Sequence, residues 1–416
     1  MKKKQRLTWL FAGIFAISML IDAAASGLPR QYDGRTKDWT VQIKDQGSLG
    51  TCWAFASLTA LETSLPAGTQ QSFSVDHMSL WEAVRNGQRD GGDYVMSMAY
   101  LLSWEGPVLE SQDPYGDGKR QKGLAPACHV QEIQILEDGD LQKVKESVLQ
   151  YGGVQSSLYL DLNGPEGESP YYQKAQAAYC YTGAKKPNHD IVIVGWDDHY
   201  PKENFKKVPA GDGAFLCMNS WGKEFGINGY FYVSYYDSCI GTCNIAYTDI
   251  DLAGRYDTIY QTDLCGWTGQ VGYESDTAWF ANIYTASHKE TLEAVGFYAT
   301  GPETEYQVYA VTGLADKNGL NQRKLVASGE FEQAGFYTVP LKKGLELEKD
   351  QDFAVIVKIT SPGKVHPVAV ECDMRDGKRN VELKDGKGYI SYDGIRWSAD
   401  KEQGCNVCLK AYTSNR

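Results

Sequence analysis

The stretch Gln46-Gly-Ser-Leu-Gly-Thr-Cys52-Trp-Ala-Phe-Ala places a cysteine at the point where a helix is expected to begin. The residues from Cys52 to Leu65 are rich in Ala and Leu, which favour a helix, and Pro66 ends it. The positive end of a helix dipole favours a thiolate over a thiol. We therefore predict that Cys52 is a reactive thiol.

Two polar residues that could serve such a thiol lie at the ends of predicted strands. His189 opens the run Asn188-His189-Asp-Ile-Val-Ile-Val-Gly-Trp196, and Asn219 opens Asn219-Ser-Trp221-Gly. A nucleophilic cysteine needs a base, and the base needs an orienting group. A histidine and an asparagine far along the chain from the cysteine fit these two needs.

Taken together, the three motifs resemble the papain-like cysteine peptidases, in the same order along the chain. The resemblance implies that Cys52 is the nucleophile, and that His189 is its base and later its acid. Asn219 would orient His189, and Trp221 would shield their hydrogen bond from water. Gln46 would donate to the oxyanion together with the backbone N–H of Cys52.

The same resemblance indicates where a peptide substrate lies. Gly91 and Gly92 would form a strip along which the substrate backbone pairs with the enzyme, because glycine permits close approach; a simple turn between helices is the alternative. The pocket walls are expected near Val154–Leu160 and around Asn188. No cofactor is implied.

The cysteines depart from the family pattern. Leu49 stands where the family has a second cysteine three residues before the nucleophile. Cys180 is expected to form a disulfide with Cys239 or Cys243, as the family links these parts of the chain. The sequence before Leu28 is also expected to be too short for the inhibitory prosegment of the family. We therefore expect the activity to be regulated by other means.

Two groups of residues in the sequence could bind a metal ion. The insertion between His189 and Asn219 holds Asp197, Asp198 and Asp212, but these residues do not form a regular calcium loop. The pairs Cys239/Cys243 and Cys405/Cys408 could bind zinc, yet no histidine is close to either pair. We expect no metal ion at the catalytic site.

The sequence changes character near residue 250. Before it, helix-like and strand-like segments mix; after it, short alternating runs recur between turn residues, a pattern typical of an antiparallel sandwich. The second half resembles the lectin-like domain of a bacterial and archaeal secreted peptidase subgroup. Contact with glycans or the cell envelope is possible there, although Trp267, Trp279 and Trp397 are expected to pack rather than to stack on sugars.

The first 25 residues are typical of a secretory signal peptide, with a basic start, an apolar run from Leu7 to Ile21 and three alanines. An uncleaved anchor is the alternative, although the run is short for a membrane span. We expect a signal peptide at 1–25, a papain-like domain at 26–250 and a lectin-like β-sandwich domain at 251–416. The fold class is therefore α+β, with a helical and a β-rich lobe in the peptidase domain.

The amino-acid composition limits the kinds of binding partner that the protein can have. The 416 residues carry 41 Lys+Arg and 53 Asp+Glu, a formal net charge of −12, which disfavours nucleic acid and anionic membranes. The favoured function is a secreted cysteine endopeptidase acting on polypeptides, with no membrane span in the mature chain. Acyl transfer or ligation at the same site, or an inactive peptidase fold used for binding, remain alternatives.

Overall fold

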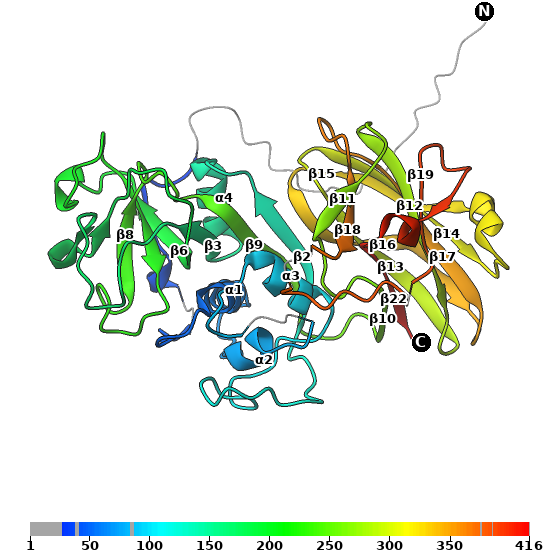
Figure 1. Cartoon of the computed structure of the whole chain (residues 1–416), viewed down its shortest axis with the longest axis horizontal. Coiled ribbons are helices and arrows are strands. Elements are labelled where there is room, and N and C mark those ends of the chain that lie inside the picture. The colour runs from blue at the N-terminus through cyan, green and yellow to red at the C-terminus, as the bar shows by residue number, and fades with distance from the viewer. Residues whose placement is uncertain (1–26, 38–40, 84–86, 375–376, 385, 416) are drawn as a thin grey trace, which may run out of the picture.

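The computed structural model describes residues 27–37, 41–83, 87–374, 377–384 and 386–415 (Figure 1). The expected signal peptide therefore lies outside the described residues. None of the helices in the described ranges is both long enough and apolar enough to cross a bilayer.

The helix predicted from Cys52 to Leu65 forms, and it ends two residues earlier, at Thr63. The α-helices of the described chain are α1 (Cys52–Thr63), α2 (Val75–Ser79), α3 (Tyr94–Leu102) and α4 (Leu141–Gln150). Asp93 caps α3 by accepting from the Met96 N–H at 3.1 Å, and Asp140 caps α4 by accepting from the Lys143 N–H at 2.9 Å. Every residue of α1 after Cys52 is buried, so this helix runs through the core.

A β-rich lobe packs against α1. Its strands are β1 (Gln31–Asp33), β2 (His129–Leu136), β3 (Val154–Leu158), β4 (Tyr172–Gln173), β5 (Ala178–Tyr179), β6 (His189–Asp197), β7 (Ala214–Met218), β8 (Tyr230–Ser234) and β9 (Thr242–Asp251). The antiparallel register of β3 and β6 sets Leu158 opposite His189 and Ser157 opposite Asp190. Strand β6 also packs against α1.

The second half is made of strands, as predicted. They are β10 (Thr258–Tyr260), β11 (Gly269–Val271), β12 (Thr277–Thr285), β13 (Glu290–Ala299), β14 (Thr304–Thr312), β15 (Lys324–Phe331), β16 (Ala334–Leu347), β17 (Asp352–Thr360), β18 (Val368–Cys372), β19 (Gly388–Ser391), β20 (Ser398–Ala399), β21 (Cys405–Val407) and β22 (Leu409–Ser414). A sheet ordered β15-β14-β17-β12-β19-β20 shares one apolar core with β13, β16 and β22. The α+β class with a β-rich second domain is confirmed.

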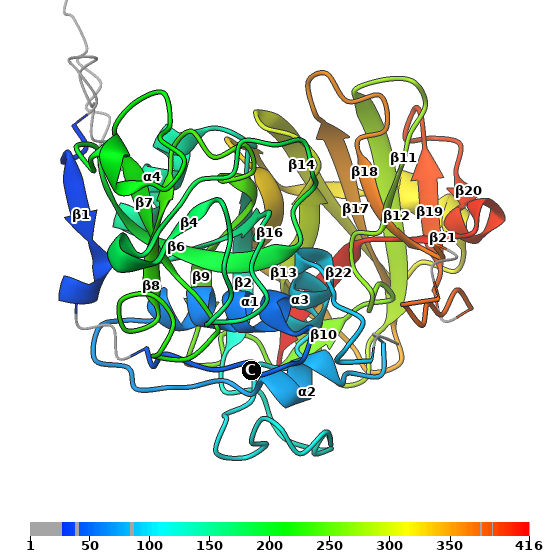
Figure 2. The same ribbon diagram turned by 60° about the vertical axis from the view of Figure 1, so that its left-hand side comes forward.

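The two halves share one sheet. Strand β16 pairs with β2, with Phe336 opposite Ile133, so the sheet runs from β10 in the second half to β4 in the first (Figure 2). The sequence did not predict β2 or β9, the two long strands at this junction. Within the described residues the two halves are therefore joined by backbone hydrogen bonds as well as by side chains.

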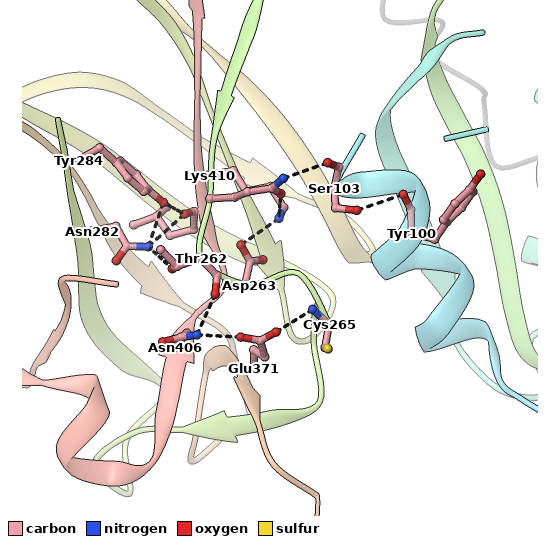
Figure 3. Close-up of polar contacts among 12 residues, drawn as sticks. Tyr100, Ser103, Thr262, Asp263, Cys265, Asn282, Tyr284, Glu371, Asn406 and Lys410 are labelled. Atoms are coloured by element: carbon pink, nitrogen blue, oxygen red, sulfur yellow. Dashed lines mark hydrogen bonds and ion pairs between the residues drawn. The ribbon is translucent and has the colours of Figure 1, made fainter. Parts of the chain in front are cut away.

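A side-chain hydrogen bond also joins the two halves, next to a buried polar cluster of the second half (Figure 3). The Gln261 side chain donates to the Ser103 carbonyl at the end of α3, at 2.9 Å, and accepts from Lys410 at 2.7 Å. The Glu371 carboxylate accepts from the Cys265 N–H and from the Asn406 amide, both at 2.7 Å. The end of α3 thus rests on a polar cluster of the second half.

The predicted disulfide is wrong. All ten cysteines lie in the described part of the chain, and all ten are free, including Cys180, Cys239 and Cys243. Cys180 is fully buried and packs in an apolar cluster with Tyr200 and Phe205. The link expected from the family pattern is replaced here by side-chain packing.

Candidate active site

Cys52 lies at the first turn of α1, as predicted, but its surroundings differ from the expectation. Burial, together with the nearby charge of Asp190, raises the pKa of the Cys52 thiol to about 11, although backbone N–H groups of Asp190 and Trp53 act in the opposite sense. The helix start alone therefore does not make the isolated side chain a thiolate. A partner that takes its proton is needed.

His189 is held in one tautomer by Asn219. The two side chains are joined by a hydrogen bond of 2.8 Å between His189 Nε2 and Asn219 Oδ1. Because Asn219 Oδ1 also accepts from the Ser220 N–H at 2.8 Å, it acts as an acceptor, and Nε2 is the donor. The other ring nitrogen, Nδ1, is left as the basic one. Burial lowers the pKa of His189 to about 4.

Trp221 packs beside this pair. Its ring centroid lies 5.0 Å from that of His189, at an interplanar angle of 47°. His189 and Asn219 are 7% and 3% exposed. Trp221 is therefore in ring contact with a buried His189–Asn219 pair.

Cys52 and His189 open onto the same pocket, which has a volume of about 330 Å³. Its lining residues are Cys52, Gly92, Asp93, Tyr94, Ser157, Lys186, Pro187, Asn188, His189, Asp190 and Cys243. Of the residues predicted for the site, Cys52, His189, Gly92 and Asn188 are thus brought together. Asn188 also accepts from the Leu160 N–H at 2.7 Å, which fixes its loop against the end of β3.

Gln46 is buried and is connected to the His189–Asn219 pair through Ser220, the residue that follows Asn219. Its Oε1 accepts from the Ser220 hydroxyl at 2.7 Å, and its Nε2 donates to the Leu49 carbonyl at 2.7 Å. These two bonds fix the amide plane. One of the two amide hydrogens is committed to Leu49, so only the second is available to a ligand.

Close packing explains Gly92 but not Gly91. A Cβ atom on Gly92 would lie 2.4 Å from the Trp53 ring, whereas a Cβ atom on Gly91 would meet no heavy atom within 4 Å. Gly91 instead has a φ of +73°, which side chains rarely adopt. A substrate strip and a tight turn are both compatible with this geometry.

Ser157 lies in the pocket wall that the sequence predicted near Val154–Leu160. Sequence reasoning did not single out four other lining residues, Asp190, Cys243, Asp93 and Tyr94. The signal for Asp190 was present, because it is a lone carboxylate at the start of an otherwise apolar strand. Nothing in the sequence indicated that Cys243 lies in this pocket, because its position depends on the pairing of β9 with β3.

The acidic residues of the insertion have partners within the chain. Asp198 Oδ1 accepts from Lys145 Nζ at 2.7 Å and from the Tyr235 hydroxyl at 2.8 Å, and Asp212 accepts from the Lys202 N–H. Groups of three or more His, Cys, Asp or Glu side chains that could hold a metal ion are not found in the described ranges.

The tryptophans of the second half pack, as expected. Trp397 is 7% exposed, and Trp267 lies 5.5 Å from the Tyr298 ring. The Arg323 guanidinium covers Trp279 at 4.4 Å from its ring centroid.

Two family models match the chain. The papain family of cysteine proteases matches residues 28–250, which is more than half of the chain, and a lectin-like domain matches residues 259–413. The resemblance seen in the sequence is confirmed for both halves.

Related proteins agree with this assignment. Cathepsin K of Gallus gallus and cathepsin S of Bos taurus are each 29% identical, over 231 and 212 residues, which cover 53% and 49% of this chain. The matched regions span 63% and 59% of the length of these two relatives. The chain therefore covers less than two thirds of the length of either relative.

Solved structures cover both halves. Clostridial Cwp84 after propeptide cleavage superposes with a TM-score of 0.81 and 27% identity, over 93% of this chain and 99% of that chain. A structure of the cysteine protease and lectin-like domains of Cwp84, described as a surface layer associated protein of Clostridium difficile, gives 0.78 and 27%, over 93% and 89%. The chain belongs to the papain family of cysteine proteases, in an arrangement with a lectin-like domain at its C-terminal side.

Proposed function

We propose that the protein is a secreted cysteine endopeptidase that cleaves peptide bonds of extended polypeptides through Cys52, His189 and Asn219. The observation that carries the proposal is the shared pocket of Cys52 and His189, with the His189 ring held by Asn219 at 2.8 Å. A nucleophile, a base and an orienting group are the set that covalent catalysis of acyl transfer needs.

The reaction starts with the transfer of the Cys52 proton to His189 Nδ1. The sulfur then forms a bond to the carbonyl carbon of the substrate, and the C–N bond breaks as His189 returns the proton to the leaving amine. Water, deprotonated by His189, attacks the thioester and releases the acid and the free thiol. The enzyme ends as it began.

Burial shapes the charge states of this pair. A lone thiolate and a lone imidazolium are each disfavoured in the pocket, because burial raises the pKa of Cys52 and lowers the pKa of His189. The two charges formed together attract each other strongly at low dielectric. We infer that the charged pair forms as a unit when substrate closes the pocket.

Gln46 and the backbone N–H of Cys52 are the proposed oxyanion donors. The amide of Gln46 is fixed by Ser220 and Leu49, which supports this role because a preorganised donor does not need to reorient as charge develops. Trp221 would preserve the His189–Asn219 bond by excluding water. Gly91, Gly92 and Asn188 are the proposed contacts of the substrate backbone.

The proposed organisation is a signal peptide at 1–25, a peptidase domain at 26–250 and a lectin-like domain at 251–416. The likeness to Cwp84, a surface layer associated protein, supports export to the cell envelope or beyond. Contact of the second domain with glycans or envelope components is part of the same proposal.

The test is labelling of the purified chain with a peptidyl epoxide, followed by mass mapping. Cys52 is expected to be alkylated, Cys52→Ala is expected to be neither labelled nor active, and His189→Ala is expected to be labelled slowly. Cys243→Ser is the matched control, because Cys243 lines the same pocket. Labelling that persists in Cys52→Ala and disappears in Cys243→Ser would contradict the proposal.

A further inference from the structure

An acidic side chain lies in the pocket next to the proposed nucleophile and lacks a cationic partner. Asp190 follows His189 in β6, and its carboxylate accepts from the Ser157 hydroxyl at 2.5 Å and from the Gln155 amide at 3.3 Å. Ion pairs of Asp190 with Lys, Arg or His are absent from the described part of the structure. Two neutral donors therefore serve a partly buried negative charge.

The other charges around Asp190 do not neutralise it. Asp93, the cap of α3, is a second carboxylate of the pocket, and it is already paired with Arg379 at 3.0 Å. Lys186 lines the pocket from an exposed loop. The remaining titratable groups that line it are Cys52 of α1, His189 of β6, Tyr94 of α3 and Cys243 of β9.

We propose that Asp190 is a specificity-determining residue that makes this pocket select polypeptides with a Lys or Arg side chain next to the cleaved bond. The inference rests on the proposed peptidase function. A partly buried carboxylate such as Asp190 loses hydration that neutral donors replace only in part, whereas a bound cation forms a charge-assisted hydrogen bond. An uncharged substrate side chain would leave the Asp190 carboxylate without a cation and would exclude more of the water that hydrates it.

The same carboxylate links substrate charge to the nucleophile. After burial, the charge of Asp190 is the second cause that raises the pKa of Cys52. A cation bound at Asp190 offsets this charge and so favours the thiolate at the moment when substrate is present. Cationic substrates should therefore gain in kcat as well as in KM.

Titration of Asp190 gives a second signature. Burial raises the pKa of Asp190 to about 6, so the carboxylate is mostly charged at pH 7.5 and mostly neutral at pH 5. The preference for a cation should be present above pH 6 and should fade as the pH falls through 6. The ratio of two substrates measured at each pH cancels the titration of Cys52 and His189, which both substrates share.

The experiment uses peptide pairs that differ only in charge, Arg against citrulline and Lys against norleucine, placed in turn at each position around the cleaved bond. For the wild type at pH 7.5, the kcat/KM ratio of the charged to the neutral peptide is expected to reach about tenfold or more at one position. Asp190→Asn is expected to bring this ratio close to one. Asp197→Asn, at the far end of the same strand and outside the pocket, is the matched control and should keep the wild-type ratio.

If Asp190→Asn does not fold, the pH dependence of the wild-type ratio carries the test alone. Equal cleavage of charged and neutral peptides at every position, with Cys52 still labelled by the epoxide, would overturn the role of Asp190 and leave the peptidase function intact. Absence of all cleavage and of Cys52 labelling in the wild type would instead overturn the proposed function.

Discussion

The Lys410 ammonium lies 2.8 Å from the Asp263 carboxylate, with the two side chains only 2% and 0% exposed (Figure 3). Lys410 is on β22, and through Gln261 it reaches the Ser103 carbonyl at the end of α3. Helix α3 begins at Tyr94, and Tyr94 lines the pocket of Cys52. A buried ion pair of the second half thus supports the helix that forms one wall of the pocket.

Lys410→Met should strongly destabilise the protein. It leaves Asp263 as a buried charge without a cation, and breaking a buried pair in this way costs about 3–5 kcal/mol. Adding Asp263→Leu should recover most of the loss, because the pair is then replaced by apolar contacts. Thermal unfolding measures both effects.

The exposed pair of Lys289 and Glu348 is the control, and Lys289→Met should leave the unfolding midpoint unchanged. A Lys410→Met midpoint equal to that of the control would show that the buried pair does not hold the two halves together.

Glu371→Gln should change how stability depends on pH. Burial raises the pKa of Glu371 to about 7, whereas in the unfolded chain it is about 4.3. The folded state holds this proton more tightly, so the stabilisation is complete below pH 4 and is lost as the pH rises through 7. The loss amounts to at most about 4 kcal/mol, and Glu371→Gln should remove it.

Chemical denaturation of the wild type and of Glu371→Gln at pH 5 and pH 8 measures this difference. The variant should be the more stable of the two proteins at pH 8. An identical pH dependence in both proteins would mean that Glu371 is already charged in the folded state at neutral pH.

Arg379→Gln, a change in the second domain, should increase the preference of the pocket for cationic peptides. The Arg379 side chain is 9% exposed and pairs with Asp93, which lines the pocket (Figure 1 shows the segment after β18 reaching α3). Without this cation, Asp93 adds negative potential to the pocket, so the preference for cationic peptides should rise by about twofold to fivefold. Lys384→Gln removes an exposed charge of the same segment and should have no such effect, as kinetics with the same peptide pairs would show.

Gln46→Ala should lower kcat by about 100-fold with a smaller change in KM, because an oxyanion donor acts mainly on charge that develops in the transition state. Ser220→Ala is the informative comparison. It removes the hydroxyl that fixes Gln46 Oε1 but keeps the amide, and should lower kcat by less than tenfold. Steady-state kinetics that gave both variants the same kcat would assign Gln46 a packing role.

Gly92→Ala should damage both stability and turnover. The added methyl group would lie 2.4 Å from the buried Trp53 ring, and overpacking of this kind costs about 1–3 kcal/mol. Trp53 follows Cys52 on α1, so a shifted ring also moves the thiol. Unfolding midpoints and the rate of epoxide labelling of Cys52 report the two effects, and wild-type values for both would show that the ring adapts freely.

Much of the protein was determined by the sequence alone, because the signals were local. The Ala- and Leu-rich segment that starts at Cys52 became α1, and the alternating runs after about residue 250 became the strands of the sandwich. The motifs around Cys52, His189 and Asn219 identified the family, because each motif is contained in one short segment.

The tertiary structure alone decided what depends on pairing between distant segments. The joining of β2 to β16, the opening of Asp190 and Cys243 onto one pocket, and the pairing of Lys410 with Asp263 bring together residues far apart in the chain. The charge state of Cys52 belongs to the same class. A helix start favours a thiolate, but burial by other segments acts in the opposite sense and prevails for the isolated thiol, and the exclusion of water that causes it is a property of the folded chain.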